Sequence, residues 1–172
     1  MPDAAASGPL IRIVDGEARI DPDDWIVLEE GGDWDGRPAR MLPLKLALAQ
    51  ADRLPGARPI GVWLAPGDEP AQAVALFDRI DLIGVRFPTF NDGRGYSTAS
   101  LLRTRHRWRG ELRAIGDVLQ DQLFFLRRVG FDSFALRADR NPQRALKAFS
   151  TFSDSYQGSV VPDLPHYRRA QA

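Results

Sequence analysis

From residue 59 onward, short apolar runs alternate with segments of helical periodicity. The apolar runs are PIGVWLAP, DLIGVRFP, ELRAIG and SFALR, and the helical segments are EPAQAVALFDRI, STASLLRTRHRW, DQLFFLRRVGF and NPQRALKAFSTF. Four β-α units in a row predict an α/β fold with a mainly parallel sheet over residues 59–152. The runs lack strict alternation, as expected of strands covered on both faces. An open doubly wound sheet and a partial β/α barrel both fit this pattern.

The N-terminal third has a different pattern, typical of antiparallel strands. IRIV and EARI flank Asp15-Gly16, a pair suited to the positive φ angles of a two-residue hairpin turn. DWIVLEE predicts a third short strand, so we expect an N-terminal β-hairpin or meander. Residues 41–54 alternate leucines like a strand, whereas their length, their alanines and Pro43 favour a helix.

Length and composition indicate one globular domain over residues 1–172, with loose termini at 1–8 and 154–172. The hydrophobic content is 44% and the charged content 27%, both ordinary for a soluble protein. We expect no membrane segment, because no apolar run approaches the ~20 residues of a spanning helix. The first residues lack the features of a signal peptide, which favours a cytoplasmic location.

The absence of cysteine narrows the possible chemistry. It excludes a thiol nucleophile, a CxxC redox pair and cysteine-ligated zinc or iron–sulfur centres. Only two histidines are present, so we expect no metal site and no intrinsic cofactor. A redox role would need a borrowed cofactor or a partner protein.

Charge is balanced overall but unevenly distributed, with basic residues concentrated in 92–144. The segment RTRHRWRG (103–110) combines arginines with an aromatic residue, a pattern that can mark nucleic-acid contact. It also lies near a predicted helix C-terminus, where cations complement the helix dipole. We therefore expect a solvated basic surface and no nucleic-acid binding.

Candidate chemistry is concentrated in the loops that follow the predicted strands, because ligands of parallel sheets bind at the carboxyl ends of strands. The loop FNDGRGYS after the second strand offers backbone N–H groups beside a helix N-terminus, and Arg94 adds a donor suited to oxyanions. Alternatively, Asp92-Gly93 forms a turn, Ser97 caps the helix and Arg94 is solvated. The expected anion or ligand contacts are Arg86, Gly93, Arg94, Gly95, Tyr96, Ser97, Gln122 and Arg137.

Two aspartates are the candidates for general base or arginine partner. Asp117 stands at the predicted end of the third strand, a suitable position for a base or for a pair with Arg94. Asp92 could orient a neighbouring arginine. The alternative is that Asp117 forms an ordinary salt bridge with an arginine at the same rim.

The runs FPTFNDGRGYSTASLLR and GELRAIGDVLQDQLFFLRRVGFDSF resemble the bacterial family called domain of unknown function 934, over roughly residues 59–152. That family is described as a probable oxidoreductase involved in sulfite reduction. The resemblance implies a role in assimilatory sulfite reduction. We expect an accessory or adaptor protein of sulfite reductase, which itself holds the siroheme and iron–sulfur cluster.

The alternative is a small α/β enzyme or module that binds an oxyanion or nucleotide at the rim of loops 86–97 and 116–122. A homodimer is a further possible assembly.

Overall fold

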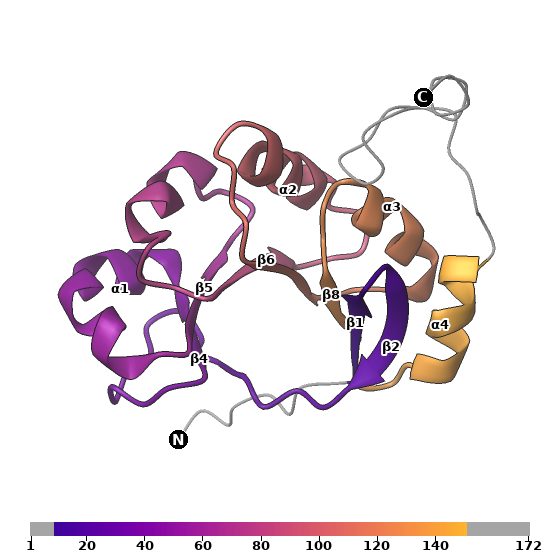
Figure 1. Cartoon of the computed structure of the whole chain (residues 1–172), viewed down its shortest axis with the longest axis horizontal. Coiled ribbons are helices and arrows are strands. Elements are labelled where there is room, and N and C mark those ends of the chain that lie inside the picture. Colours follow the sequence, from indigo (N-terminus) through magenta and orange to yellow (C-terminus); the bar gives the residue numbers. More distant parts are fainter. Residues whose placement is uncertain (1–8, 151–172) are drawn as a thin grey trace.

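All eight strands of the computed structural model join one sheet, in the order β2-β1-β8-β7-β6-β5-β4-β3 (Figure 1). The structure describes residues 9–150. Neighbouring strands from β3 to β8 run parallel, whereas β1 runs antiparallel to both β2 and β8. The strands are β1 Leu10–Val14, β2 Glu17–Asp21, β3 Ile26–Val27, β4 Arg40–Pro43, β5 Ile60–Leu64, β6 Leu82–Phe87, β7 Glu111–Gly116 and β8 Ser133–Ala135.

The helices lie along the outer side of the curved sheet (Figure 1). The α-helices in the described part of the chain are α1 Leu44–Ala49, α2 Arg94–Thr104, α3 Leu123–Arg128 and α4 Pro142–Ser150. Three further segments are 3₁₀ helices: η1 Ala51–Ala57, η2 Pro70–Leu76 and η3 Gln120–Gln122. Residues 41–54, ambiguous in sequence, thus contain the end of a strand followed by helical turns.

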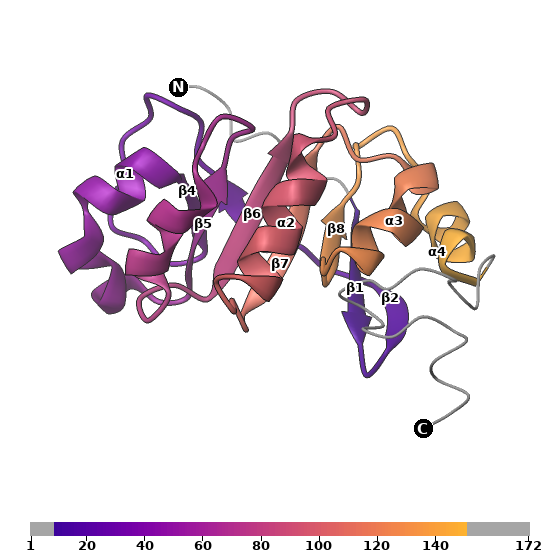
Figure 2. The same ribbon diagram turned by 90° about the horizontal axis from the view of Figure 1, so that it is seen from above.

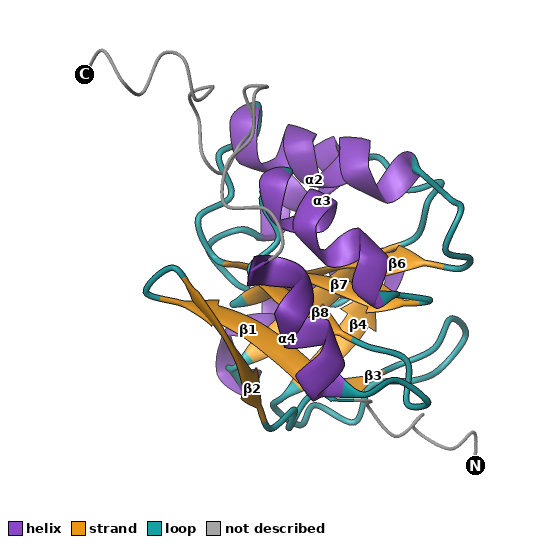
Figure 3. Cartoon of the chain, turned by 90° about the vertical axis from the view of Figure 1, so that its right-hand side faces the viewer, coloured by secondary structure: helices purple, strands orange, loops and turns teal. Residues whose placement is uncertain are grey.

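The prediction of a mainly parallel sheet of four β-α units is wrong. The sheet is mixed, has eight strands and curls into a half-barrel. The predicted hairpin is confirmed, with Asp15 and Gly16 at positive φ, but it is not a separate appendage. β1 pairs with β8, and Figure 3 shows the hairpin beside α4. Of the third predicted strand only β3 forms, and it pairs with β4 at the sheet edge opposite β2. The described N-terminal strands therefore do not form a meander.

The curl of the sheet follows from how its two edges are connected. The edge strands β2 and β3 are consecutive in sequence, joined only by residues 22–25, which we call the strap. Five extended residue steps reach at most about 18 Å, whereas eight flat strands spaced about 4.8 Å apart would be about 34 Å wide. The sheet must therefore bend until its edges approach, and the strap crosses the open side (Figure 1).

Side chains alternate between two faces of this curved sheet. Ile83, Val85 and Phe87 of β6 belong to the large core beneath the helices. A smaller apolar cluster of Met41, Trp63, Leu82 and Ile115 has Trp25 of the strap packed against it, so it lies on the inner, concave face. Because successive side chains of a strand point to opposite faces, one set packs under the helices and the other set faces the strap.

Two further expectations concern the membrane and the chain termini. No helix within residues 9–150 is long and apolar enough to cross a membrane. The predicted loose termini, 1–8 and 154–172, lie outside the described residues.

Candidate functional site

The loop between β6 and α2 is anchored at Phe90. Asp117 accepts a hydrogen bond from the Phe90 backbone N–H at 2.9 Å, and the Gln122 side-chain amide donates to the Phe90 carbonyl at 2.5 Å. Gln122 also accepts from the Leu119 N–H at 3.1 Å. The Phe90 ring is nevertheless 54% exposed. The backbone of Phe90 is therefore fixed by two neighbouring segments while its side chain points to solvent.

Asp117 pairs with Arg137 rather than with Arg94. Arg137 donates to Asp117 at 3.1 Å and makes a two-pronged contact with Asp139 at 2.9 and 3.1 Å. These carboxylates raise the pKa of Arg137, first through the hydrogen bond to Asp117. The structure thus brings Asp117, Gln122 and Arg137 together around Phe90, and the ion pair predicted between Asp117 and Arg94 is replaced by this one.

Arg94 forms a separate, local pair with Asp92. Its guanidinium donates to both Asp92 oxygens at 2.7 and 3.0 Å, and its backbone N–H donates to the same carboxylate at 3.1 Å. These hydrogen bonds lower the pKa of Asp92 and raise that of Arg94. The helix α2 begins at Arg94, so the Asp92 carboxylate accepts the first backbone N–H of the helix. Ser97, the expected cap, lies inside the helix and is exposed.

The glycines of this loop have different roles. A Cβ on Gly95 would lie 2.5 Å from a ring carbon of Phe87, so Gly95 is required for packing of α2 against β6. Gly93 has only open space around it. Tyr96 packs edge-to-face on Phe87 with ring centroids 5.7 Å apart, and burial raises the pKa of its hydroxyl. Gly95 and Tyr96 are thus parts of the core boundary.

Arg86 belongs to the concave face of the half-barrel. Its guanidinium makes two hydrogen bonds to Glu29, at 2.6 and 2.8 Å, and lies 3.9 Å from the ring centroid of Trp63. The hydrogen bond from Arg86 lowers the pKa of Glu29. No local pattern predicts this pair, since Glu29 lies 57 positions away in the loop after β3.

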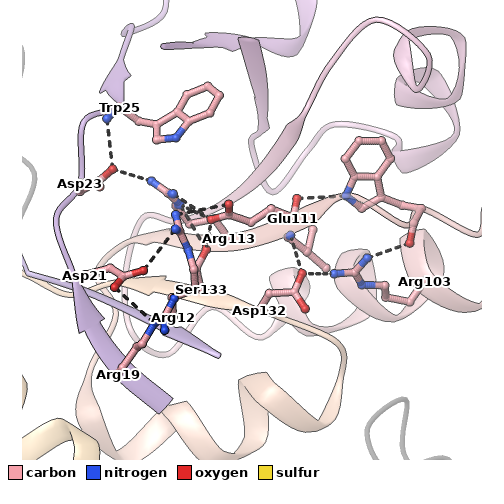
Figure 4. A network of polar contacts seen from close by, with 12 residues as sticks. Arg12, Arg19, Asp21, Asp23, Trp25, Arg103, Glu111, Arg113, Asp132 and Ser133 are labelled. Atoms are coloured by element: carbon pink, nitrogen blue, oxygen red, sulfur yellow. Dashed lines mark hydrogen bonds and ion pairs between the residues drawn. The ribbon is translucent and has the colours of Figure 1, made fainter. Parts of the chain in front are cut away.

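A larger polar network, not anticipated from the sequence, fills the centre of the concave face (Figure 4). Arg113 of β7 is 1% exposed and donates to Asp23 of the strap at 2.7 Å, to Glu111 at 2.8 Å and to Ser133 at 3.2 Å. Burial raises the pKa of Glu111, but the charges of Arg113 and Arg12 and hydrogen bonds from Ser133 and Arg113 outweigh it, so the pKa is lowered. This network fastens the strap to the middle of the sheet.

Residues 61–167 match the profile of a family described as "Bacterial protein of unknown function (DUF934)". The chain belongs to this family. No curated protein matches the chain. The matched range contains every predicted site residue, from Arg86 to Arg137, but excludes Glu29 and the strap. The description of the family names no activity, so a role in sulfite reduction stays a prediction.

The charges of the rim limit what it can bind. Each predicted anion-binding arginine already has carboxylate partners: Arg86 has Glu29, Arg94 has Asp92, and Arg137 has Asp117 and Asp139. An oxyanion would have to displace a carboxylate from a charge-assisted hydrogen bond. Among residues 9–150, no group of three or more His, Asp or Glu side chains is placed to hold a metal ion. The distinctive feature of the rim is therefore the anchored, exposed Phe90.

Proposed function

We propose that this protein is an accessory protein of assimilatory sulfite reduction that docks on sulfite reductase through a surface centred on Phe90. One observation supports a docking role above the others. Phe90 exposes 54% of its surface while Asp117 and Gln122 hold its backbone N–H and carbonyl. The link to sulfite reduction comes from the family resemblance of the sequence.

An anchored aromatic side chain suits protein recognition. Aromatic residues often dominate the binding energy of interfaces, and a pre-ordered backbone reduces the entropy lost on association. Phe125, 52% exposed, lies three residues after Gln122 on α3 and therefore on the same side of the helix. We call Phe90, the glutamine that anchors its loop, and Phe125 the Phe90 surface.

An accessory role also fits the chemistry of the chain. The protein has no cysteine, whereas sulfite reductase carries its own siroheme and iron–sulfur cluster. The rim arginines Arg94 and Arg137 are matched by carboxylates, which favours a protein contact over a small oxyanion. The alternative function is binding of an oxyanion or nucleotide at the same rim.

Binding of the purified protein to sulfite reductase from the same organism, measured by biolayer interferometry, tests the proposal. Phe90→Ala should weaken binding by about thirtyfold, the effect of losing an interface residue worth about 2 kcal/mol. Ile20→Ala is the matched control, because Ile20 is an exposed apolar residue on the distant strand β2. Its affinity should equal that of the wild type.

Equal binding by the Phe90 and Ile20 variants would place the contact elsewhere. If sulfate or sulfite raises the melting temperature of the wild type but not of Arg94→Ala, the oxyanion site is favoured instead, since a ligand stabilises the folded state by mass action.

A further inference from the structure

Within residues 9–150, the unpaired arginines are concentrated in one turn. Among the described residues, nearly every arginine side chain has a carboxylate, carbonyl, amide or aromatic partner. The exceptions are Arg144 on α4 and three residues of the turn between α2 and β7, Arg105, Arg107 and Arg109, all exposed. In a chain of zero net charge, this turn is a local excess of positive charge.

The turn is held rigidly by its other residues. Arg103, largely buried, donates to the carbonyls of Trp108 and Gly110 at 2.8 and 2.9 Å and to that of Gly130 at 2.9 Å, and it pairs with Asp132. Trp108 is buried and donates to the Glu111 carbonyl at 3.0 Å. A Cβ on Gly110 would collide with the Trp108 ring. One arginine and one tryptophan therefore form the inside of the turn, while its three other arginines face solvent.

Two exposed apolar residues, Val74 and Leu101, belong to the two helical elements that adjoin this turn. Leu101 stands four positions before Arg105, on the same face of the chain as it leaves α2. Val74 stands three positions before Phe77, which packs on Trp108 with ring centroids 4.9 Å apart. Val74 is therefore one helical turn along η2 from the residue that packs on Trp108. We call Val74, Leu101 and residues 105–109 the basic surface.

The basic surface is separate from the Phe90 surface. The first follows the C-terminal end of α2 and the second precedes its N-terminal end, beside β6 and β7 (Figure 2). Eleven helical residues separate the two ends by about 16 Å. The two surfaces can therefore contact different segments.

We infer that the basic surface docks an acidic protein segment that also carries apolar residues. Charge complementarity selects the acidic partner, and arginines around an apolar centre are typical of protein interfaces. Nucleic acid fits less well. Trp108, the aromatic residue of the turn, is buried and unable to stack on bases, and the sequence pI is about 6.7. This inference needs neither Phe90 nor sulfite reductase.

The test uses fluorescence anisotropy with a fluorescein-labelled amphipathic peptide of glutamate and leucine at low ionic strength. The wild type should bind it, and added salt should weaken binding. Arg105→Gln/Arg107→Gln/Arg109→Gln should bind at least about tenfold more weakly. The control Arg37→Gln/Arg140→Gln/Arg144→Gln removes the same charge from other surfaces and should bind like the wild type. A thermal melt of each variant verifies folding.

Further probes separate the alternatives. A peptide with glycine in place of leucine should bind more weakly than the parent, and Leu101→Ser should reduce that difference. Phe90→Ala should bind the parent peptide as the wild type does, which keeps this inference independent of the proposed function. Absence of peptide binding, or equal weakening in both triple variants, overturns the inference. Tighter binding of an oligothymidine of the same charge as the peptide would show a nucleic-acid site instead.

Discussion

The concave face and the rim both pair arginines with carboxylates, but they do so in opposite surroundings. Arg113 and Asp23 are almost fully buried, with side-chain exposures of 1% and 6%. The side chain of Arg94 is 65% exposed, whereas that of its partner Asp92, two positions earlier, is 12% exposed and also accepts the Arg94 backbone N–H. A buried pair is costly to break because its partner is left charged and unsolvated, whereas water replaces a surface partner. An arginine–carboxylate pair therefore stabilises the fold on the concave face, whereas at the rim water can take the place of the arginine.

The largest expected effect is on stability, from the concave face. Arg113→Ala should lower the free energy of unfolding by about 3–5 kcal/mol, because Asp23 and Glu111 lose their buried partner. Urea denaturation followed by circular dichroism measures this. Arg94→Ala, the matched rim variant, should unfold at the urea concentration of the wild type. Equal losses in the two variants would contradict the distinction between the regions.

A smaller difference in stability is expected between alanine variants of two glycines in the rim loop. Gly95→Ala should cost about 1–3 kcal/mol, because its Cβ would overlap the Phe87 ring. Gly93→Ala should be nearly neutral, because nothing lies within 4 Å of that position. Thermal melts of both variants compare them directly. A neutral Gly95→Ala would show that α2 can move away from β6.

The smallest effect concerns acid stability. The pKa of Glu111 is lower in the folded protein, so its contribution is present at neutral pH and is lost as pH falls below the ordinary glutamate range through the folded-state pKa. Glu111→Gln should therefore flatten the acid side of the stability profile, while lowering stability at neutral pH. Urea midpoints measured across the acid range test this. An unchanged slope would mean that Glu111 does not titrate differently on folding.

The sequence identified local features well and distant pairings poorly. Apolar runs located β5 to β8, and Asp15-Gly16 located the hairpin, because both depend on neighbouring residues. The pairing of β1 with β8, which makes the sheet mixed, joins segments more than a hundred residues apart and leaves no local pattern.

The candidate site divides in the same way. The Asp92–Arg94 contact spans two positions and was foreseen, whereas Arg113 and Asp23 are 90 positions apart. ELRAIG gave no indication that its arginine would be buried. The exposure of Phe90 also escaped prediction, because the loop around it is held by residues far along the chain: the Phe90 N–H donates to Asp117, and Gln122 donates to the Phe90 carbonyl.

Amide hydrogen exchange of this protein with and without sulfite reductase tests the central claim most directly. If the rim is a docking surface, the complex should protect residues 88–93 and the start of α3, and Phe90→Ala should remove that protection at equal concentrations. The buried strands of the concave face should exchange slowly in both states. Protection that is absent, or that survives the loss of the Phe90 ring unchanged, would contradict the account.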